Sequence, residues 1–398
     1  MNILFVICLL LLLSYLLELF NQKIRLPSVI FLIASGLALK ESVIIFYPEF
    51  YQAYNIVSLL PIIGTVGLIL IVLEGAIELE ISRNKLSIVS NATLISFLSI
   101  IANVFIITLL LKIFWNIETD WNFLLLQILP FAIISSAIAI PAVRFMDKTV
   151  KEFVIYESSL SDIFGVIVFN FLLVNETINW ANSFYFIYQI LLMLVISIII
   201  SIGLSLFLSK INHHVKFIPI IIVIILVYLI SKIYHLPSLL LILVFGLTIK
   251  NFEKLSHFKF TEKIVDFFQP QILNKELKKF EDIVNESAFL VKTMFFILLG
   301  YSLDINDILN IQSLEISMLI ITIIYLLRII LLWLFKVPTS PILFIAPRGL
   351  ISILLFIQIP ENMRHNLLNM SVIVQTVILT TITMAIGNMV YKNKNTPS

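Results

Sequence analysis

The stretch "LPSVIFLIASGLALK" at residues 26–40 occurs again as "LPSLLLILVFGLTIK" at residues 236–250. Leu, Pro, Ser, Gly, Leu and Lys occupy the same places in both copies. A second pair of similar segments follows them in the same order, "AIELEI" at 76–81 and "GYSLDI" at 300–305. One match between apolar segments is weak, but two in the same order predict that the chain folds as two related halves.

The composition indicates a membrane protein. Of the 398 residues, 60% are hydrophobic and 13% are charged, whereas about 25% of the residues are charged in a soluble protein. A helix needs about 20 mostly apolar residues to span a bilayer. Lipid offers the backbone no hydrogen-bond partners, so we predict that every span is a helix. Thirteen segments fit this description: 2–20, 27–47, 57–79, 88–111, 121–143, 152–174, 184–209, 217–234, 236–249, 284–303, 313–335, 339–360 and 369–391.

The repeated stretches lie seven predicted spans apart, because they open spans 2 and 9 and close spans 3 and 10. Seven is odd, so the second copy enters the membrane from the opposite side. Inverted-topology repeats are typical of secondary transporters. We therefore predict an all-α polytopic fold with two six-helix inverted repeats, at 1–178 and 216–398, joined by a linker helix at 179–215. The second repeat includes an amphipathic cytoplasmic linker at 250–283.

Basic residues predict the orientation of the chain. Nineteen Lys and Arg residues fall in the loops after odd-numbered spans or in the C-terminal tail, and four fall on the opposite side, in the remaining loops or in the second halves of spans 2 and 8. We therefore expect the N-terminus outside and the C-terminus in the cytoplasm. The first segment lacks a basic start and a small-residue cleavage site, so we expect it to be a span and not a removed signal peptide.

Several function classes lack the residues that they need. Cys8 is the single cysteine, so no internal disulfide can form, and the five histidines make no metal-binding helix face. No Gly-rich loop for phosphate is present, which leaves direct use of ATP without support. We expect a transporter in the lipid bilayer and not an enzyme, with no cofactor and no nucleic-acid partner.

Two of the predicted spans are interrupted. Span 5 reads "PFAIISSAIAIPAVRF" and contains Ser135, Ser136 and Pro141. Span 12, its mate under the seven-span relation, reads "SPILFIAPRGLISILL" and contains Pro347 and Gly349. Proline removes a hydrogen bond from a helix interior, and unwound backbone at this depth is tolerated only inside protein or beside water. Two breaks at related positions favour a binding site at the repeat interface.

A carboxylate lies in the middle of span 6, in the stretch "YESSLSDIFGVIVFN" at 156–170. A charged side chain at mid-bilayer costs about 3 kcal/mol, so Asp162 needs a function or a partner. A carboxylate there can hold a proton or a cation but hardly both, and that competition is itself a mechanism of exchange. The alternative is that Ser158, one turn back, satisfies Asp162, which then never titrates.

The other charged residues inside spans have predicted structural or electrostatic roles. Glu157 points about 140° away from the mid-span carboxylate, and we expect it to pair with Arg328 of span 11, because an arginine is always charged. Arg348 beside the break in span 12 could compensate helix-end carbonyls or balance the charge of the cavity. Lys292 of span 10 could pair with a carboxylate or reach the surface. Glu74 of span 3 could line a funnel that attracts cations.

These motifs together resemble a known family. "ESSLSD" in span 6 is similar to the Glu-Ser-x-x-Asn-Asp signature of the monovalent cation/proton antiporter superfamily, particularly the sodium/proton exchangers. "GLILIVLEGAIELE" resembles that family's span 3, "ISSAIAIPAV" its unwound span 5, "FFILLGYSLDI" its span 10 and "APRGLISILL" its Arg-Gly-containing span 12. The likeness covers nearly the whole membrane chain.

The resemblance implies roles for these residues and segments. Asp162 would carry the ion and the proton, while Glu157 and Arg328 would form a structural ion pair. Spans 5 and 12 would be the crossing broken helices, with Pro141 in the first and Pro347, Arg348 and Gly349 in the second. Spans 4–6 and 11–13 would form a moving core, and the rest would be the scaffold of a homodimer.

The candidate cation ligands are Asp162 and the hydroxyls of Ser158, Ser135 and Ser136. Ser161 stands where the exchangers usually carry Asn and electrogenic relatives carry a second Asp. It can still offer an oxygen, but the departure leaves the ion preference open. With a single carboxylate in the cycle, one-for-one electroneutral exchange is expected. Lys292 complicates this expectation, because electrogenic relatives also have a lysine in span 10.

We therefore predict Na⁺/H⁺ exchange by alternating access. The Ile-, Asn- and Lys-rich composition suits an AT-rich bacterial genome, so we expect a bacterial inner membrane. The nearest alternative is K⁺/H⁺ exchange by the same machinery, and Li⁺ is a further candidate ion. A sodium-coupled symporter of an organic solute would need a larger polar cavity. A membrane scaffold that transports nothing would leave Asp162 and the paired breaks unexplained.

Overall fold

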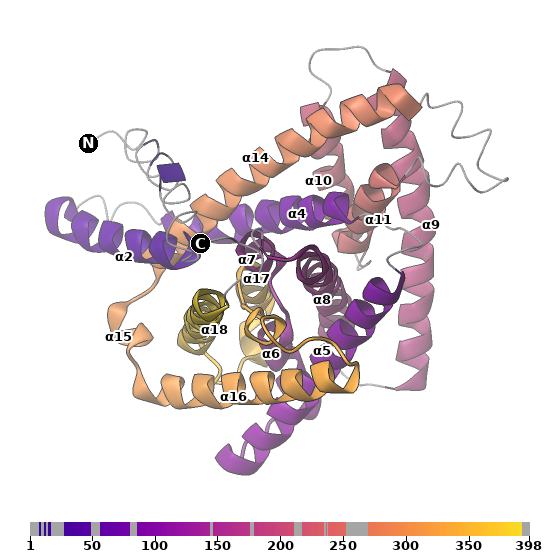
Figure 1. Ribbon diagram of the computed structural model, residues 1–398. Coiled ribbons are helices and arrows are strands. Elements are labelled where there is room, and N and C mark those ends of the chain that lie inside the picture. Colours follow the sequence, from indigo (N-terminus) through magenta and orange to yellow (C-terminus); the bar gives the residue numbers. More distant parts are fainter. Residues whose placement is uncertain are drawn as a thin grey trace. The chain divides into compact units, whose positions relative to one another are not determined.

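The computed structural model describes residues 28–48, 56–79, 86–143, 146–175, 179–210, 217–234, 238–251 and 270–391, with isolated residues at 8, 12, 15, 16 and 236 (Figure 1). Within these ranges the chain forms helices and no strand, which confirms the predicted all-α class. In chain order the helices are α2 (Ser28–Phe46), η1 (Ile56–Leu59), α4 (Leu60–Glu78), α5 (Leu86–Trp115), α6 (Trp121–Ala132), α7 (Ser136–Ala142), α8 (Lys148–Val174), α9 (Trp180–Lys210), α10 (Phe217–Ile233), α11 (Ser238–Lys250), α14 (Pro270–Ser302), α15 (Ile305–Ile308), α16 (Ile311–Leu334), η3 (Ile342–Phe344), α17 (Leu350–Gln358), η4 (Glu361–Met363) and α18 (Met370–Val390).

Nine helices of the described chain are long and apolar enough to cross a membrane. Helix α5, for example, runs for 30 residues without a glycine or a proline to weaken it. The shorter apolar helices α10 and α11 correspond to predicted spans 8 and 9. Predicted span 1, at 2–20, lies almost wholly outside the described residues, so the total of thirteen spans stays a prediction.

Helix α14 is longer than the sequence predicted. It begins at Pro270, a residue suited to the first turn of a helix, and continues for 33 residues to Ser302. The second half of the predicted interfacial linker at 250–283 is therefore part of the same helix as span 10. The first half of that linker, from residue 252 to residue 269, lies outside the described residues.

The chain divides into two compact units. The first contains Met1–Gly67, Ile88–Gly165 and Leu290–Ser398, and the second contains Leu68–Ser87 and Val166–Phe289. The division does not coincide with the predicted repeats. A repeat is a relation of chain topology and not of compactness, so the predicted domains remain untested.

Each unit is held by helix packing and aromatic contacts. In the first unit α16 packs on α18 and α17 on α6, where the rings of Phe131 and Phe356 meet edge-on with centroids 6.2 Å apart. In the second unit α11 packs on α9 and α10, and Phe245 of α11 meets Phe280 with ring centroids 6.3 Å apart.

Two helix pairs approach closely at small residues. In the first unit, a Cβ atom on Gly36 of α2 would lie 2.9 Å from the Cα atom of Gly300 in α14. In the second unit, a Cβ atom on Gly246 of α11 would lie 2.5 Å from the Cβ atom of Ala76 in α4. Both distances are shorter than real Cβ contacts, so any larger residue would push the backbones apart.

Polar side chains bind the ends of two long helices. In the first unit, Lys40 Nζ donates to the Leu303 carbonyl at 2.9 Å, directly after α14, and forms an ion pair with Asp304. In the second unit, Asn251 Nδ2 donates to the Leu79 carbonyl at 3.0 Å, directly after α4. Carbonyl groups at a helix C-terminus have no partner within the helix, so these donors satisfy them.

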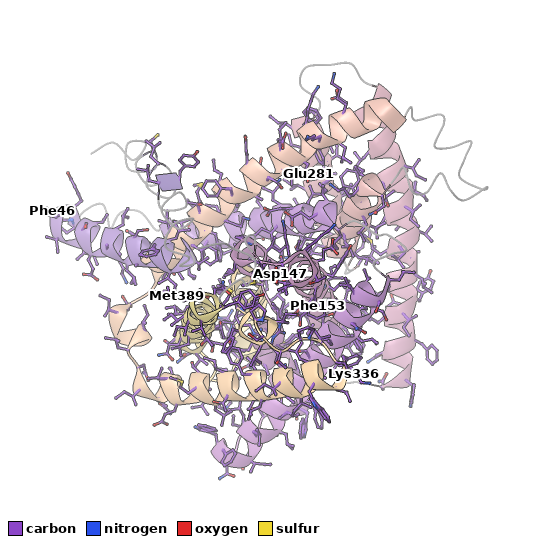
Figure 2. All side chains as sticks on the ribbon, viewed as in Figure 1. Phe46, Asp147, Phe153, Glu281, Lys336 and Met389 are labelled. Carbon is purple, nitrogen blue, oxygen red and sulfur yellow. The ribbon has the colours of Figure 1, made fainter. Side chains whose placement is uncertain are left out.

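Large apolar side chains remain exposed on many helices. Phe46 at the end of α2 and Met389 near the end of α18 are two examples that Figure 2 labels. Extended exposed apolar surface is unusual for a soluble protein. It is the expected surface of a multi-pass membrane protein, whose outer side chains face lipid.

Candidate cation-binding site

Predicted span 5 is interrupted in the first unit. Helix α6 ends at Ala132 and α7 begins at Ser136, and the segment 133–135 between them is extended. The break leaves backbone amides without helical partners, and two of them turn to α8. The Ile134 amide donates to Ser161 Oγ at 2.9 Å, and the Ser136 amide donates to Asp162 Oδ2 at 3.3 Å. The prediction of a broken span 5 therefore has a structural basis in α8.

The break in span 5 does not fall at the proline that drew attention to it. Pro141 lies inside α7, near its C-terminal end, and Pro130 lies inside α6. The unwound residues at 133–135 are instead fixed by hydrogen bonds to side chains that are far away in sequence. Pro141 is thus part of the second half of the broken span and not of its break.

Predicted span 12 is interrupted as well. The short helix η3 ends at Phe344 and α17 begins at Leu350. Pro347, Arg348 and Gly349 all lie in the non-helical segment 345–349, where the sequence placed them. The Arg348 amide donates to Thr380 Oγ1 of α18 at 3.1 Å, so α18 supports this break as α8 supports the other.

The two breaks touch each other. The Ser135 amide donates to the Pro347 carbonyl at 2.9 Å. A Cβ atom on Gly349 would lie only 2.5 Å from Ser135 Oγ, so a side chain at residue 349 would occupy the space of that hydroxyl. The absence of a side chain at Gly349 therefore permits the crossing of the two unwound segments.

Asp162 lies beside this crossing with one oxygen uncommitted. Its side chain is 4% exposed, and Oδ2 accepts from the Ser136 amide. Its Oδ1 atom has no hydrogen-bond partner among the described residues, and the same is true of the hydroxyls of Ser135, Ser159 and Ser352. Buried polar atoms are normally paired. Uncommitted oxygens beside an unwound backbone are the kind of set that holds Na⁺ or a proton in transporters.

The neighbouring serines differ in what they do. Ser158 Oγ donates to the Val154 carbonyl at 2.7 Å, so the structure does not show it satisfying Asp162. Its oxygen still has lone pairs for a cation. Ser161 Oγ accepts a hydrogen bond from the Ile134 amide and so holds the unwound backbone of span 5. Ser136 reaches Asp162 through its amide.

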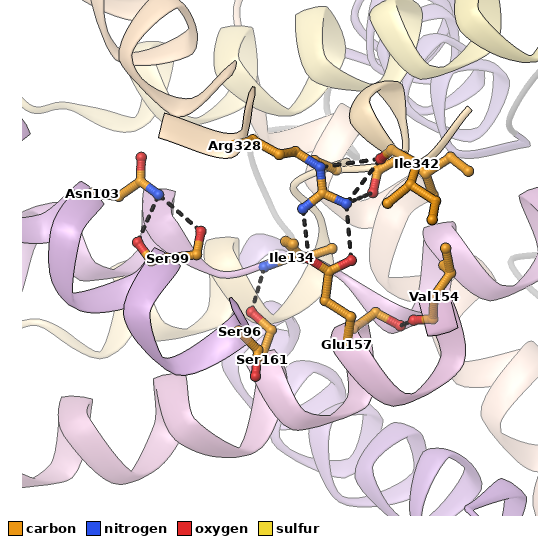
Figure 3. Close-up of polar contacts among 12 residues, drawn as sticks. Ser96, Ser99, Asn103, Ile134, Val154, Glu157, Ser161, Arg328 and Ile342 are labelled. Carbon is orange, nitrogen blue, oxygen red and sulfur yellow. Dashed lines mark hydrogen bonds and ion pairs between the residues drawn. The ribbon is translucent and has the colours of Figure 1, made fainter. Parts of the chain in front are cut away.

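Glu157 and Arg328 form a two-pronged ion pair (Figure 3). Arg328 Nη1 lies 2.7 Å from Glu157 Oε1 and Nη2 lies 2.9 Å from Oε2, and both side chains are at most 3% exposed. The guanidinium also donates to the carbonyls of Ile342 and Ile345, next to the break in span 12. The sequence indicated the pair but not its contact with the break.

Arg348 is 1% exposed and binds helix-end carbonyls. Its Nε atom donates to the Phe131 carbonyl in the last turn of α6 at 2.6 Å, and Nη1 donates to the Ala346 carbonyl at 3.0 Å. A helix C-terminus carries partial negative charge, which a cation stabilises. Of the two alternatives for Arg348, the observed contacts favour compensation of helix-end carbonyls.

The two remaining candidates lie on other helices. Lys292 is half-buried in α14 and belongs to the first unit, while Glu74 is half-buried in α4 and belongs to the second. Their predicted roles stay predictions.

Sequence reasoning missed several polar groups of the first unit. Ser352, Ser159 and Thr380 received no role, although Ser352 interrupts an apolar run close to a break, and Ser159 and Thr380 each belong to a pair of hydroxyl residues inside a predicted span. Asn103 of α5 is fully buried, and its Nδ2 donates to the Ser99 carbonyl at 2.7 Å and to Ser99 Oγ at 3.1 Å (Figure 3). A search for single polar residues inside apolar spans would have found Ser352 and Asn103, whereas Ser159 and Thr380 each have a polar neighbour in the sequence.

Comparisons with known proteins show the family of the chain. The family model described as "Sodium/hydrogen exchanger, transmembrane" matches residues 8–391. No sequence among curated proteins matches the chain. The fold is similar to that of the sodium proton antiporter MjNhaP1 from Methanocaldococcus jannaschii at pH 8, with a TM-score of 0.70 and 17% identity over 96% of this chain and 98% of that one. A second structure of that antiporter, from electron microscopy, matches with a TM-score of 0.68 and 17% identity over 100% of both chains. Because the family model covers nearly the whole sequence, the chain belongs to the sodium/hydrogen exchanger family.

Proposed function

We propose that the protein exchanges Na⁺ for H⁺ by alternating access, and that the two ions compete for Asp162. Membership of a family of secondary transporters supports the activity, and it also argues against an enzyme. The observation that carries the mechanism is the buried Oδ1 of Asp162, which has no partner among the described residues while Oδ2 is held by the amide of an unwound segment.

The buried charges of the first unit support a competition between the ions. Glu157 and Arg328 neutralise each other directly. The remaining buried arginine, Arg348, carries one positive charge, and ionised Asp162 carries one negative charge. Adding either a proton or a monovalent cation to Asp162 changes the total charge by the same amount. Each ion can therefore replace the other, but burial disfavours a state with both.

The breaks provide polar groups that can replace the water around either ion. Unwound backbone directs amides and carbonyls sideways, where a helix would pair them internally. Here the Ser136 amide holds the carboxylate of Asp162, and the hydroxyl of Ser135 in the same break is uncommitted. Ser158, Ser135 and Ser136 remain candidate ligands with Asp162, and Ser161 is proposed to position the Ile134 amide.

The decisive experiment is proton flux in proteoliposomes on addition of Na⁺, Li⁺ or K⁺ in turn. We expect Na⁺ to drive the largest flux. A larger response to K⁺ would favour the K⁺/H⁺ alternative, and no response to any of the three ions would refute cation/proton exchange. Acceleration of organic-solute uptake by Na⁺ would favour the symporter instead.

We also propose that the chain is built from two inverted repeats. Gly36 and Gly246 occupy the same place in the repeated stretches, and each touches a residue that heads the second repeated pair: Gly300 for the first and Ala76 for the second. Equivalent residues thus make equivalent close contacts, once in each unit, which supports the repeat.

The helix ends give the same correspondence. Leu79 and Leu303 occupy equivalent places in "AIELEI" and "GYSLDI". The carbonyl of each accepts a hydrogen bond from near the end of a repeated stretch: Lys40, the last residue of the first stretch, donates to Leu303, and Asn251, the residue after the second stretch, donates to Leu79. The two predicted spans with breaks, 5 and 12, are related by the same shift.

The cellular setting is part of the proposal. The distribution of basic residues supports an outside N-terminus and a cytoplasmic C-terminus, and we propose a homodimer in a bacterial inner membrane. Because Cys8 is the single cysteine, a Cys8→Ser background with Ser398→Cys gives a unique label at the C-terminus. Labelling of intact cells by a membrane-impermeant thiol reagent would contradict the orientation. Cross-linking in membranes checks the dimer.

A further inference from the structure

Ser352 carries a buried hydroxyl group to which no structural hydrogen bond is assigned. It lies in the first turn of α17, is 1% exposed, and its Oγ atom has no hydrogen-bond partner among the described residues. Buried serines in helices usually bond back to the carbonyl one turn earlier. Ser158, Ser197 and Ser317 do so here, at 2.6–2.8 Å. Ser352 has no earlier helical turn, because α17 begins only at Leu350.

The position of Ser352 directs it towards the crossing of the breaks. Gly349 is the residue that caps the start of α17, and Ser352 is the third residue of that helix. The cap and the third residue of a helix are close enough for their side chains and backbones to bond reciprocally. Gly349 packs directly against Ser135 Oγ, so the same end of α17 faces the break in span 5.

Three uncommitted oxygens therefore belong to segments that meet at the crossing of the two broken helices. They are Asp162 Oδ1 from α8, Ser135 Oγ from the first break and Ser352 Oγ from the start of α17. Asp162 is tied to this place by the amide of Ser136, the residue after Ser135. No two of these oxygens come from the same element, so a ligand that used all three would join α8 to both broken spans.

We propose that Ser352 supplies a hydroxyl ligand to the transported cation, opposite Asp162, and so helps to set the affinity for Na⁺. This rests on the proposed exchange at Asp162. A hydroxyl is suited to both states of the cycle, because it can offer its lone pairs to a cation or to a protonated carboxyl and can turn its proton to an ionised one. Neighbouring Arg348 does not take this place, since its Nε and Nη1 atoms donate to the Phe131 and Ala346 carbonyls.

The structural alternative is that Ser352 only fills space. The two possibilities differ in which property a substitution changes. Ser352→Ala removes the oxygen, Ser352→Cys keeps a similar volume but replaces the oxygen with sulfur, and Ser352→Thr keeps the hydroxyl. Ser197→Ala in α9 is the matched control, because Ser197 is fully buried but bonds only to the Met193 carbonyl.

The experiment has two readouts on the purified full chain. The first is the apparent KM and the maximal rate of Na⁺-driven proton flux in proteoliposomes. The second is the Na⁺ concentration that gives half of the Na⁺-induced rise in melting temperature in detergent at alkaline pH, which reports binding without transport. For Ser352→Ala and Ser352→Cys we expect both concentrations to rise about tenfold, the size of losing one bond to a charged group. The maximal rate should change little.

Ser352→Thr should stay near the wild type, and so should Ser197→Ala. The proposal is overturned if Ser352→Ala and Ser352→Cys keep the wild-type KM and half-saturation, or if Ser197→Ala shows the same rise. Failure of the proposed exchange function would give a different result, because the wild-type protein itself would then show no cation-driven proton flux. The melting measurement would still test whether Ser352 binds Na⁺ in that case.

Discussion

The backbone amide of Ser135 donates a hydrogen bond to the carbonyl of Pro347, so the two broken helices are joined directly at their unwound segments. Each segment also has its own support, from Asp162 and Ser161 of α8 on one side and from Thr380 of α18 on the other. A rearrangement at one break must therefore be transmitted to the other or must break this bond. Ion binding at Asp162 acts on the same backbone that carries the crossing.

Gly349→Ala should damage the crossing. The new methyl group would lie 2.5 Å from Ser135 Oγ and 2.8 Å from Ser135 Cβ, so one of the two breaks has to move. Overpacking of this kind costs about 1–3 kcal/mol. We expect a lower melting temperature in detergent and a marked loss of cation-driven proton flux.

Gly203→Ala of α9 is the control for this change. A Cβ atom there meets nothing within 4 Å, and alanine is favoured over glycine in a helix by about 1 kcal/mol. It should be neutral or slightly stabilising, with normal flux. If Gly349→Ala behaves like Gly203→Ala, the close crossing of the breaks is wrong.

Asp162→Asn should abolish exchange while the protein stays folded. The amide oxygen of asparagine can still accept the Ser136 amide, so the break keeps its support. The side chain can no longer release a proton, and it offers a cation no negative charge. We expect flux at the level of empty liposomes with a near-normal elution profile and melting temperature. Asp282→Asn, an exposed position of α14, is the matched control. Normal exchange by a folded Asp162→Asn protein would exclude the proposed mechanism.

Glu157 and Arg328 should be coupled energetically, but not symmetrically. Neutralising either one leaves a buried charge unpaired, at a cost of about 3–5 kcal/mol. Arg328 additionally binds the carbonyls of Ile342 and Ile345, so Arg328→Gln should be worse than Glu157→Gln. The double variant should recover part of the combined loss. A double-mutant cycle on melting temperature tests this, and simple additivity would show that the two residues are not partners.

The membrane-spanning helices could be predicted from the sequence because a span in lipid must be about 20 apolar residues long. Helices that extend beyond the apolar segment could not be predicted in this way. Apolar length located α5 and α16 well, since nothing in those stretches competes with the rule. Helix α14 was cut too short because the charges of "NKELKKFED" end the hydropathy signal although the helix itself continues. Hydropathy locates the part of a helix that lies in lipid and not the full length of the helix.

The candidate site shows where sequence reasoning ends. Asp162, Glu157 and Arg328 could be found because a charge in an apolar span is conspicuous. The break at 133–135 was indicated by Ser135 and by the resemblance of "ISSAIAIPAV", but its bounds could not be predicted, since Ile133 and Ile134 give no local signal and the Ile134 amide bonds to Ser161 of α8, 27 residues away. Ser352 was overlooked for a different reason: a single serine in an apolar run is common, and only its missing partner makes it unusual.

Exchange should be electroneutral, and the reasoning rests on the charge that the site carries. Asp162 can release one proton and take up one monovalent cation, while both oxygens of Glu157 are bound by Arg328 and take no part. Ser161 cannot supply a second negative charge, and its oxygen already accepts an amide. The loaded site therefore carries the same charge in both directions. In proteoliposomes, a Na⁺ gradient should drive proton movement equally well with and without valinomycin and K⁺ to clamp the membrane potential, once K⁺ has been shown not to be transported. Lys292 provides the critical control: a strong dependence on potential that disappears in Lys292→Gln would mean that this lysine carries a second proton, and that each cycle moves net charge.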